Sequence, residues 1–419
     1  MKKIIKKSLR RIIQERSRLE EYMLMNKDWP QKANRKKVLM AVGNYWTSPF
    51  QVGSHHIAKG FVEAGWDVAF ISDPISPVHL LGGNLEDLKK RFKIYGTGGK
   101  NYLEGKLWTY IPFAMFTPHN KPFLRSQFVA KNWYKFTVPN LVKKIKNAGF
   151  EEVDLLYFDS INQYFWLDKI NHKNSILRIA DKNSGFRKYT SAARVMETRL
   201  AQKVDAVIYS AHNLEEYVKS LRPKKMFHVP NGVNFEHFAG GSRAMPPDYR
   251  NIPRPIAIYV GAMDLWFDYD LVSEAARELP NISFVLIGPA ELARKKLQLL
   301  QNIHLLGPRK YDELPPYLYN SDVGIIPFDV KGHADLVNSI HPLKLYEYMA
   351  CGLPVVSVEW QEIKKLGSPA ILCNSKEDFV KNLLELHFIS NNKIDYINYA
   401  KRQNWVKRID NLIKILGDL

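Results

Sequence analysis

The sequence predicts an α/β protein built from two doubly wound, Rossmann-like domains. A chain of 419 residues is longer than one ordinary hydrophobic core, so two domains are expected. Short apolar runs of strand length alternate with spacers of helix length in both halves of the chain. A segment rich in glycine and proline, residues 239–255, separates the two halves as an exposed linker would.

The N-terminal segment is strongly basic. Residues 1–37 hold 13 Lys or Arg against 4 Asp or Glu, in a chain of net charge +19. Apolar residues recur there at helical spacing, at Ile5, Leu9, Ile12 and Ile13. This pattern predicts a basic amphipathic helix over residues 1–35, which can lie on an anionic membrane surface. Packing on the protein's own surface and a disordered basic tail are the alternatives, and the lack of a base-reading module argues against nucleic acid.

Cysteine content and hydropathy predict the compartment. Cys351 and Cys373 are the two cysteines, and their positions show no metal-ligand spacing, which fits a reducing environment. No apolar run approaches the ~18 to 20 residues that cross a bilayer. Basic residues also interrupt the apolar stretch that a signal peptide would need. We therefore expect a cytoplasmic protein, peripherally associated with the inner face of the plasma membrane.

The first half of the chain opens as a doubly wound domain does. The run KKVLMAVG predicts a buried strand, followed by a loop that contains Gly43 and Gly53 and then by a helical pattern. The apolar runs DVAFIS, VDLLYFDS, SILRIA and DAVIYS continue the alternation and predict a parallel sheet. The G-x-G-x-x-G pattern of dinucleotide enzymes is absent. Residues 74–125, rich in Pro, Gly and aromatic residues, are predicted to lack regular structure.

Candidate catalytic groups stand where strands of this half end. Asp159 follows the run LLYF, and Asp181 follows ILRIA. His56, with His55, lies near the start of the first predicted helix. Ligands of open α/β sheets bind beyond the carboxyl ends of the strands, so a carboxylate or imidazole there can act as a general base for a hydroxyl group. For each residue, a cap or turn role is the alternative.

The second half begins with PIAIYVGAMDLWFDYDLV, which predicts a strand, a turn at Gly261 and a helix opened by Asp268. The runs ISFVLIGP, IHLLGPRK and DVGIIPF continue the strand and helix alternation. Gly261, Gly288 and Gly307 each end a predicted strand on the edge where ligands bind.

The most informative stretch is HPLKLYEYMACGLPVVS, residues 341–357. Pro342 suits the first position of a helix, and Gly352 suits the position just past its end. A helix that begins at Pro342 directs its free N–H groups at an anion, and Lys344 adds a positive charge in its first turn. Glu347 lies on about the same helix face. This spacing suits a diphosphate and a ribose diol, while a solvated Lys and Glu on a surface helix is the alternative.

The run PLKLYEYMACGLPVVS resembles the nucleotide-sugar signature of GT-B glycosyltransferases of the bacterial cell-envelope and exopolysaccharide type, such as the teichuronic-acid transferases. PNGVNFEHF resembles the interdomain junction of the same enzymes, and the resemblance covers about residues 36–419. It implies two Rossmann-like domains that face each other across a cleft, with a C-terminal helix that crosses back to the first domain. The expected parts are an acceptor domain at 36–235, a linker at 236–254, a donor domain at 255–395 and the crossing helix at 396–419.

The resemblance also implies a set of site residues. In this family the Glu that matches Glu347 binds the ribose hydroxyls, and the basic residue before it lies near the diphosphate. GPRKYDELPPYL resembles the segment near the nucleotide base. The residues expected to bind the donor are Lys344, Glu347, His341, Ser339, Arg309, Tyr311, Gly261 and Gly288. Asp159 resembles, by its position, the general base of the xanthan-pathway glucuronosyltransferase, and His56 and Asp181 are the other catalytic candidates.

Two departures from the family pattern bear on the chemistry. Many retaining members carry Glu-x7-Glu, but Ser339 stands at the place of the first Glu, and GAMDLWFD lacks the usual cations. Without an Asp-x-Asp motif, no metal and no cofactor are expected. The expected reaction moves a sugar from a nucleoside diphosphate, by default UDP, to a hydroxyl of a glycan or lipid-linked acceptor. A sugar-nucleotide epimerase, a glycogen-synthase-like polymerase and a non-catalytic scaffold of the same fold are the alternatives.

Overall fold

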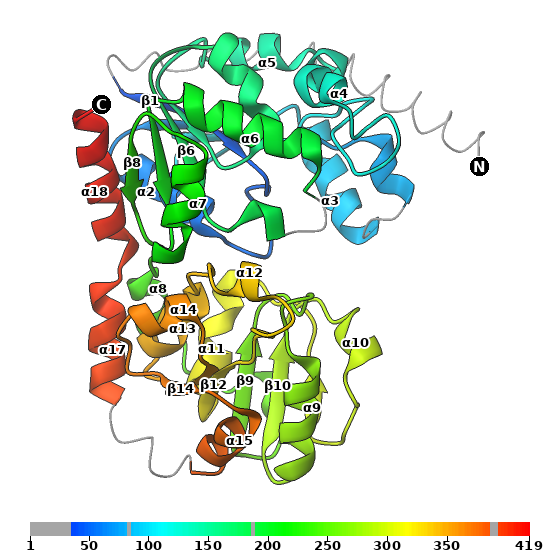
Figure 1. Cartoon of the computed structure of the whole chain (residues 1–419), viewed down its shortest axis with the longest axis vertical. Coiled ribbons are helices and arrows are strands. Elements are labelled where there is room, and N and C mark those ends of the chain that lie inside the picture. The colour runs from blue at the N-terminus through cyan, green and yellow to red at the C-terminus, as the bar shows by residue number, and fades with distance from the viewer. Residues whose placement is uncertain (1–34, 82–84, 186–188, 386–392) are drawn as a thin grey trace. The chain divides into compact units, whose positions relative to one another are not determined.

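The structure is a computed structural model that describes residues 35–81, 85–185, 189–385 and 393–419. The chain divides into two compact units, Met1–Trp46 with Phe61–Lys173 and Thr47–Gly60 with Asn174–Leu419. The predicted basic helix of the N-terminal segment, and the membrane contact expected of it, lie outside the described residues. Figure 1 shows the elements with the labels used below.

The first unit contains a mainly parallel sheet. Its strands are β1 (Lys37–Val42), β2 (Asp67–Ser72), β3 (Lys100–Tyr102), β4 (Leu107–Tyr110) and β5 (Glu152–Phe158). They lie in the order β3-β4-β2-β1-β5, and only the β3–β4 pair among them is antiparallel. β1 is buried from its second residue to its end, as its apolar run predicts for a strand that is covered on both faces.

Helices and short 3-10 turns connect these strands. They are η1 (Pro77–Leu81), α3 (Leu85–Gly96), α4 (Gln127–Asn132), η2 (Trp133–Phe136), α5 (Leu141–Asn147) and η3 (Ile161–Asp168). Two further elements, α2 (Gly53–Glu63) and β6 (Asn171–Ile179), contain residues of both units.

The prediction that residues 74–125 lack regular structure is wrong. They contain η1, α3, β3 and β4. Glu86 and Asp87 stand in the first turn of α3, where acidic side chains favour a helix N-terminus, and β4 is buried throughout. The glycines that suggested irregular structure lie between the elements, because Gly98 and Gly99 make the turn from α3 into β3 with positive φ angles.

The second unit contains the end of one parallel sheet and a complete second one. β6, β7 (Ala206–Tyr209) and β8 (Met226–His228) lie side by side and parallel. The second sheet has the order β11-β10-β9-β12-β13-β14, and every pair in it is parallel. Its strands are β9 (Ile256–Val260), β10 (Ser283–Ile287), β11 (Ile303–Leu305), β12 (Val323–Ile326), β13 (Val355–Val358) and β14 (Ile371–Cys373).

Two groups of helices flank this second sheet. α9 and α15 pack together, and α13 packs with α8 and α17 (Figure 1). The helices and 3-10 turns of the second unit are η4 (Asn183–Gly185), α6 (Ser191–Lys203), η5 (His212–Leu214), α7 (Glu215–Ser220), α8 (Phe235–Ala239), η6 (Pro247–Tyr249), α9 (Tyr269–Glu278), α10 (Ala293–Lys296), η7 (Tyr311–Glu313), α11 (Leu314–Tyr319), α12 (Ala334–Val337), α13 (Leu343–Ala350), α14 (Gln361–Lys365), α15 (Lys376–Leu384), α17 (Lys393–Arg402) and α18 (Trp405–Gly417). Asp268 caps α9, as predicted, by accepting a hydrogen bond from the Leu271 N–H.

The expected single C-terminal helix is two helices. α17 ends at Arg402, and α18 begins at Trp405. Asn404 is the N-cap of α18, since its side chain accepts a hydrogen bond from the Val406 N–H at 3.3 Å. α17 packs on α13, whereas α18 contacts the elements around β6 and β8: Leu416 accepts a hydrogen bond from the side chain of Asn174, and Asp418 accepts one from Lys225. The C-terminal segment therefore returns from the second sheet to strands of the first, as the family resemblance implies.

Two glycine positions set the backbone at the ends of the strands. An Asn-Gly pair such as Asn231-Gly232 is typical of a turn with a positive φ, but Gly232 does not have one; a Cβ there would lie 2.8 Å from the carbonyl oxygen of Gln403. Gly288 has a φ of +153°, and a Cβ on it would lie 1.9 Å from the carbonyl oxygen of Gly261. The ends of β9 and β10 therefore come together only because Gly288 carries no side chain.

This close approach predicts that Gly288→Ala destabilises the second sheet severely, by about 3 kcal/mol or more, because the new methyl group meets backbone rather than a movable side chain. Gly367→Ala is the matched control: its φ is +55°, but no atom lies within 4 Å of a Cβ there. We expect the control to cost about 1 to 2 kcal/mol. Urea unfolding of both variants measures the difference, and equal losses would contradict the steric explanation.

Candidate functional site

Helix α13 presents its N-terminus at the carboxyl edge of the second sheet. Pro342 is the N-cap rather than the first helical residue, with φ −80° and ψ 111°, and the helix begins at Leu343. Gly352 follows the helix with a φ of +70°, so its predicted role as the terminating residue is confirmed. The free N–H groups of the first turn lie beside Lys344, which is the combination that binds anions in other proteins.

Lys344 is a partly buried cation without an acidic partner. Its ammonium nitrogen lies 5.1 Å from the ring centre of Tyr259 and 4.8 Å from that of Phe328. Among the described residues, no side chain or backbone group forms a hydrogen bond with its ammonium group, and no carboxylate forms an ion pair with it. Burial lowers the pKa of Lys344 from 10.5 to about 8, although the charge of Glu347 opposes that shift. An anion placed against this nitrogen would restore its usual pKa.

Gly261 leaves the space beside this ammonium group. A Cβ at Gly261 would lie 3.2 Å from Cε and 3.3 Å from Nζ of Lys344. The φ of Gly261 is +149°, a conformation that other residues rarely adopt. Gly261 and Lys344, which the sequence analysis named separately as donor-binding residues, therefore lie next to each other, and Gly288 lies against the Gly261 carbonyl.

Glu347 is the second charged group of this helix face. It is half-buried, and within the described ranges no hydrogen bond or ion pair satisfies its carboxylate. Burial raises the pKa of Glu347 from 4.5 to about 7, and Lys344 opposes this shift. Two ionisable groups one helical turn apart thus have their charged forms disfavoured by burial and lack local partners. Such a pair is characteristic of a binding site rather than of a solvated surface.

Tyr311 lies next to Glu347. It is buried, its hydroxyl group has no hydrogen-bond partner, and its pKa is raised by burial and then by the charge of Glu347. Its ring stacks on His237 at 4.6 Å and lies 5.5 Å from the ring of His56. His56 in turn stacks on Trp405, with ring centres 5.3 Å apart. The structure therefore gathers Glu347, Tyr311 and His56, three residues that the sequence singled out separately.

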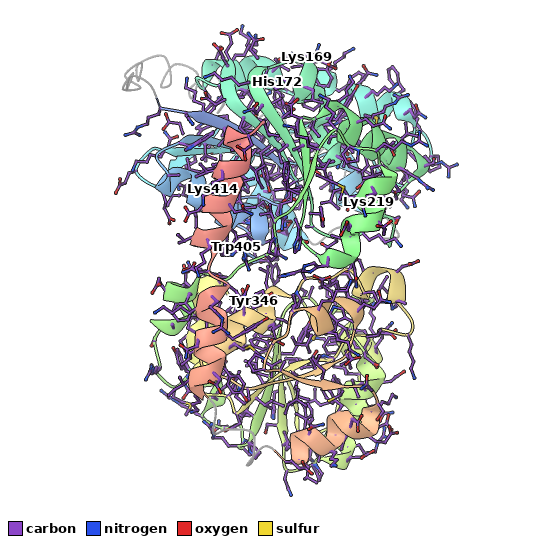
Figure 2. The ribbon with its side chains drawn as sticks, turned by 60° about the vertical axis from the view of Figure 1, so that its left-hand side comes forward. Lys169, His172, Lys219, Tyr346, Trp405 and Lys414 are labelled. Atoms are coloured by element: carbon purple, nitrogen blue, oxygen red, sulfur yellow. The ribbon has the colours of Figure 1, made fainter. Side chains whose placement is uncertain are left out.

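The imidazoles near this site are neutral. Burial, followed by the charge of Lys59, holds the pKa of His56 well below its usual range, so the protonated ring is disfavoured and the neutral imidazole is present at pH 7. His341 is also buried, and burial lowers its pKa. The Nδ1 atom of His341 has no partner, while Nε2 lies 3.2 Å from the hydroxyl of Tyr346. Figure 2 shows Tyr346 directed from α13 toward α17, where it meets the ring of Tyr399 at 6.0 Å.

A hydrogen-bonded chain that the sequence did not reveal holds the start of α13. The side chain of Asn231 donates to the carbonyl of His341 at 2.9 Å and accepts from Nη2 of Arg178 at 2.7 Å. A Cβ on Gly53 would lie 2.4 Å from the same Nη2 atom, so the guanidinium group of Arg178 fills the place of a side chain at the start of α2. In the sequence, only Gly53 and the Asn231-Gly232 pair indicate that the backbone is special here, and neither indicates a contact with Arg178.

Two predicted donor residues are engaged elsewhere in the protein. Arg309 donates hydrogen bonds to the Leu306 carbonyl, the Tyr317 hydroxyl and the Asp248 carboxylate, at 2.7, 2.9 and 3.0 Å. These bonds tie the segment after β11 to the linker. The hydroxyl of Ser339 donates to the Leu336 carbonyl at 2.8 Å and is buried. In this structure both side chains have structural roles, and their contact with a donor stays a prediction.

The first unit carries Asp159 in a separate polar network. Its backbone N–H donates to the Ala41 carbonyl at 2.8 Å, directly after β5. The residues that follow it are held by Asp73, whose carboxylate accepts hydrogen bonds from Ser160, Asn162 and Gln163 at 2.7, 2.8 and 3.1 Å. Burial raises the pKa of Asp73 despite these bonds. Asp73 directly follows the run DVAFIS. Asp159 and Asp181 were chosen because they follow predicted strands, and the same criterion would have selected Asp73.

Comparison with known protein families supports the architecture. Residues 40–210 match the model described as the N-terminal domain of the glucuronosyltransferase GumK, and residues 254–387 match the model described as glycosyl transferases group 1. Both halves of the chain match glycosyltransferase domains. The family resemblance and the glycosyltransferase class that the sequence predicted are confirmed by these matches.

Solved structures agree with this classification. The chain superposes on a sucrose-phosphate synthase from Thermosynechococcus elongatus with a TM-score of 0.65 at 15% identity, covering 92% of this chain and 99% of that one. It superposes on Anabaena HepE in complex with UDP and glucose with a TM-score of 0.60 at 14% identity, covering 92% and 100%. The chain has the GT-B fold.

Curated relatives match shorter stretches. The putative teichuronic acid biosynthesis glycosyltransferase TuaH of Bacillus subtilis is 27% identical over 214 residues, which is 49% of this chain and 51% of TuaH. The UDP-glycosyltransferase TURAN of Arabidopsis thaliana is 27% identical over 124 residues, 27% of this chain and 26% of TURAN. The chain thus spans about half of the first relative and about a quarter of the second. No helix in the described part of this GT-B chain combines the length and the apolar character needed to cross a bilayer.

The raised pKa of Glu347 predicts a pH-dependent cost in stability. Because folding raises this pKa from 4.5 to about 7, the folded protein binds the proton more tightly than the unfolded chain, and wild-type stability falls as the pH rises through that window. Glu347→Gln lacks this loss. We expect the variant to equal wild type near pH 4.5 and to exceed it above pH 7 by on the order of 1 to 3 kcal/mol. Urea unfolding across pH measures it, and a pH-independent difference would contradict the assignment.

Proposed function

We propose that this chain is a glycosyltransferase that binds a nucleoside-diphosphate sugar, with UDP as its nucleotide, and transfers the sugar to a hydroxyl group of a glycan or lipid-linked acceptor in envelope or exopolysaccharide synthesis. The observation that carries the proposal is the pair Lys344 and Glu347. Both charges are partly buried and lack protein partners, and they lie at the N-terminus of a helix that faces the carboxyl edge of a parallel sheet.

Lys344 and the N–H groups of α13 would bind the diphosphate. Gly261 leaves room for a phosphate oxygen beside the ammonium group, because its missing Cβ would lie 3.3 Å from Nζ. When the bond to the sugar breaks, negative charge develops on the leaving phosphate, and a preorganised cation there stabilises the transition state by about 3 kcal/mol. In this proposal Lys344 takes over the charge neutralisation that a metal ion performs in other transferases.

Glu347 would bind the ribose of the nucleotide. An ionised carboxylate accepts hydrogen bonds from two neighbouring hydroxyl groups. Such bonds would give the Glu347 carboxylate the hydrogen-bond donors that the described residues do not supply. Tyr311 lies beside it with an unpaired hydroxyl group and can bond to the same sugar. UDP is favoured as the nucleotide because the similarly folded HepE was solved with UDP and glucose, and TURAN is named a UDP-glycosyltransferase.

Asp159 is the proposed general base for the acceptor hydroxyl. It stands at the carboxyl end of β5, and Asp73 orders the residues that follow it through three hydrogen bonds. Asp73 is thereby a positioning residue, since its own oxygens are occupied. His56, a neutral imidazole near Tyr311, and Asp181, two residues past β6, are the alternative bases. The acceptor itself is proposed by similarity to TuaH alone.

Thermal unfolding with UDP, GDP, CDP and dTDP, each in turn, tests the donor site. A nucleotide at 100 times its Kd stabilises the folded state by about 2.7 kcal/mol, so UDP should raise the melting temperature measurably. Lys344→Met should abolish this rise without lowering the melting temperature of the free protein, because it removes a charge whose burial is unfavourable. Lys364→Met, which removes an exposed lysine paired with Glu359, is the control and should keep the full response to UDP.

If no nucleotide stabilises the protein, or if Lys344→Met responds to UDP like wild type, the donor site is misplaced. Absence of any nucleotide effect would favour the non-catalytic scaffold with the same fold.

Asp159→Asn tests the base separately from the donor site. The amide cannot accept the acceptor's proton, so we expect turnover to fall by about 100-fold or more while the UDP-induced rise in melting temperature is retained. Asp168→Asn, at an exposed position in the same unit, is the control and should keep wild-type turnover. Turnover of Asp159→Asn within a few-fold of wild type would move the role to His56 or Asp181.

A further inference from the structure

Two histidines and a glutamate converge in the second unit, apart from the residues assigned to the donor. They are His212 in η5, His228 at the end of β8 and Glu362 in α14. One ligand atom of each lies within 4.8 Å of the others, and the rings of the two histidines are 4.0 Å apart. We propose that His212, His228 and Glu362 bind a divalent metal ion of the zinc class.

His228 has the orientation of a metal-binding histidine. Its Nε2 atom is buried and has no hydrogen-bond partner. The backbone of Ser210 lies within hydrogen-bonding reach of the ring. A backbone carbonyl that accepts from Nδ1–H fixes the tautomer with a lone pair on Nε2, which is the arrangement found around metal-bound histidines.

Glu362 supplies an oxygen ligand of fixed position. The residue is fully buried, and its two oxygens accept hydrogen bonds from the backbone N–H groups of His212 and Asn213 at 2.9 and 3.0 Å. The Nδ1 atom of His212 lies 3.3 Å from Oε1. Zinc bonds of about 2.0 to 2.1 Å place tetrahedral ligands about 3.3 Å apart, so these two atoms already have the separation that a shared zinc ion requires.

Access and charge also fit a bound cation. The side chain of His212 is 49% exposed, whereas that of Glu362 is 0% exposed, so the group has one ligand that can move and one that is fixed. The three ligand atoms now lie within 4.8 Å of one another, and a shared tetrahedral zinc ion would require them to approach to about 3.3 Å, a change that the exposed ring of His212 can accommodate. Arg408 lies close enough to affect His228, but its guanidinium group is held by Gln403 and the Asn231 carbonyl, and Glu362 offsets its charge.

The competing explanation is that Glu362 only caps the turn at His212 and Asn213. That role accounts for the backbone hydrogen bonds of Glu362, but it leaves the buried Nε2 of His228 without a partner. A metal ion would account for both, and it would join η5 and β8 to α14, which lies far from them in the sequence. The donor-site proposal is independent of this one, since the two share no residue.

Zinc titration of the full-length protein, produced without a histidine tag and stripped with EDTA, tests the proposal. Calorimetry should show about one zinc site per chain, and Co²⁺ in place of zinc should give the visible absorption of a tetrahedral site. His228→Gln should weaken zinc binding at least tenfold. Its melting temperature without metal should stay close to wild type, because the Nε2 atom has no hydrogen bond to lose.

His304→Gln is the matched control. His304 in β11 also has a buried Nε2 atom without a partner, but it does not belong to the cluster, so this variant should bind zinc like wild type. Glu362→Gln keeps an oxygen for the turn and should lose zinc binding. Unchanged zinc affinity in His228→Gln, an equal loss in His304→Gln, or binding of Mg²⁺ in preference to zinc would overturn the proposal.

Discussion

The constraint on which the second half of the chain depends is the burial of two opposite charges for which the described residues supply no hydrogen-bond or ion-pair partner. Lys344 rests against the rings of Tyr259 and Phe328, and Glu347 lies one turn further along the same helix. Their pKa values are shifted toward each other, to about 8 and about 7, because each charged form loses hydration. A fold can keep such groups only if other interactions hold the helix in place, and a ligand with a phosphate and a diol would relieve the cost.

Close backbone packing supplies that support. The ends of β9 and β10 meet where Gly288 lies against the carbonyl of Gly261, which leaves the space beside Lys344 open. At the other end of the site, Asn231 connects the carbonyl of His341 to the buried guanidinium group of Arg178, and Arg178 packs on Gly53. Each of these contacts uses a glycine or a short amide side chain, so the helix start is fixed by backbone geometry rather than by bulky packing.

The two units contribute different chemistry. The second unit combines the charged helix with aromatic rings, because Tyr311 stacks on His237 and lies 5.5 Å from the tilted ring of His56, while its hydroxyl has no partner among the described residues. The first unit holds Asp159 in a loop that Asp73 orders through hydrogen bonds. Asp73 and Glu362 are alike in that each buried carboxylate fixes a loop by accepting several N–H or O–H donors. Beside Glu362, the Nε2 atom of His228 has no hydrogen-bond partner among the described residues, and the proposed metal ion would bind to it.

The sequence by itself determined the α/β class, most strand positions, the helix that Gly352 follows and the placement of Lys344 and Glu347 on one face of that helix. Those features depend on local rules: strand-length apolar runs, helix termini and spacing along one helix face. Sequence reasoning failed at residues 74–125, where glycines between elements hid α3, β3 and β4, and at the C-terminus, where Asn404 separates two helices.

Only the tertiary structure decided which residues meet. In the folded chain, Arg309 bonds to Asp248, and Ser339 bonds to a backbone carbonyl. His56 contacts Tyr311, more than 250 residues away in the chain. The side chains of His212, His228 and Glu362 lie close together. The physical reason is that a hydrogen bond or ring contact requires atoms a few ångströms apart. Such distances between remote residues are set by how the sheets and helices pack, and no spacing along the sequence contains them.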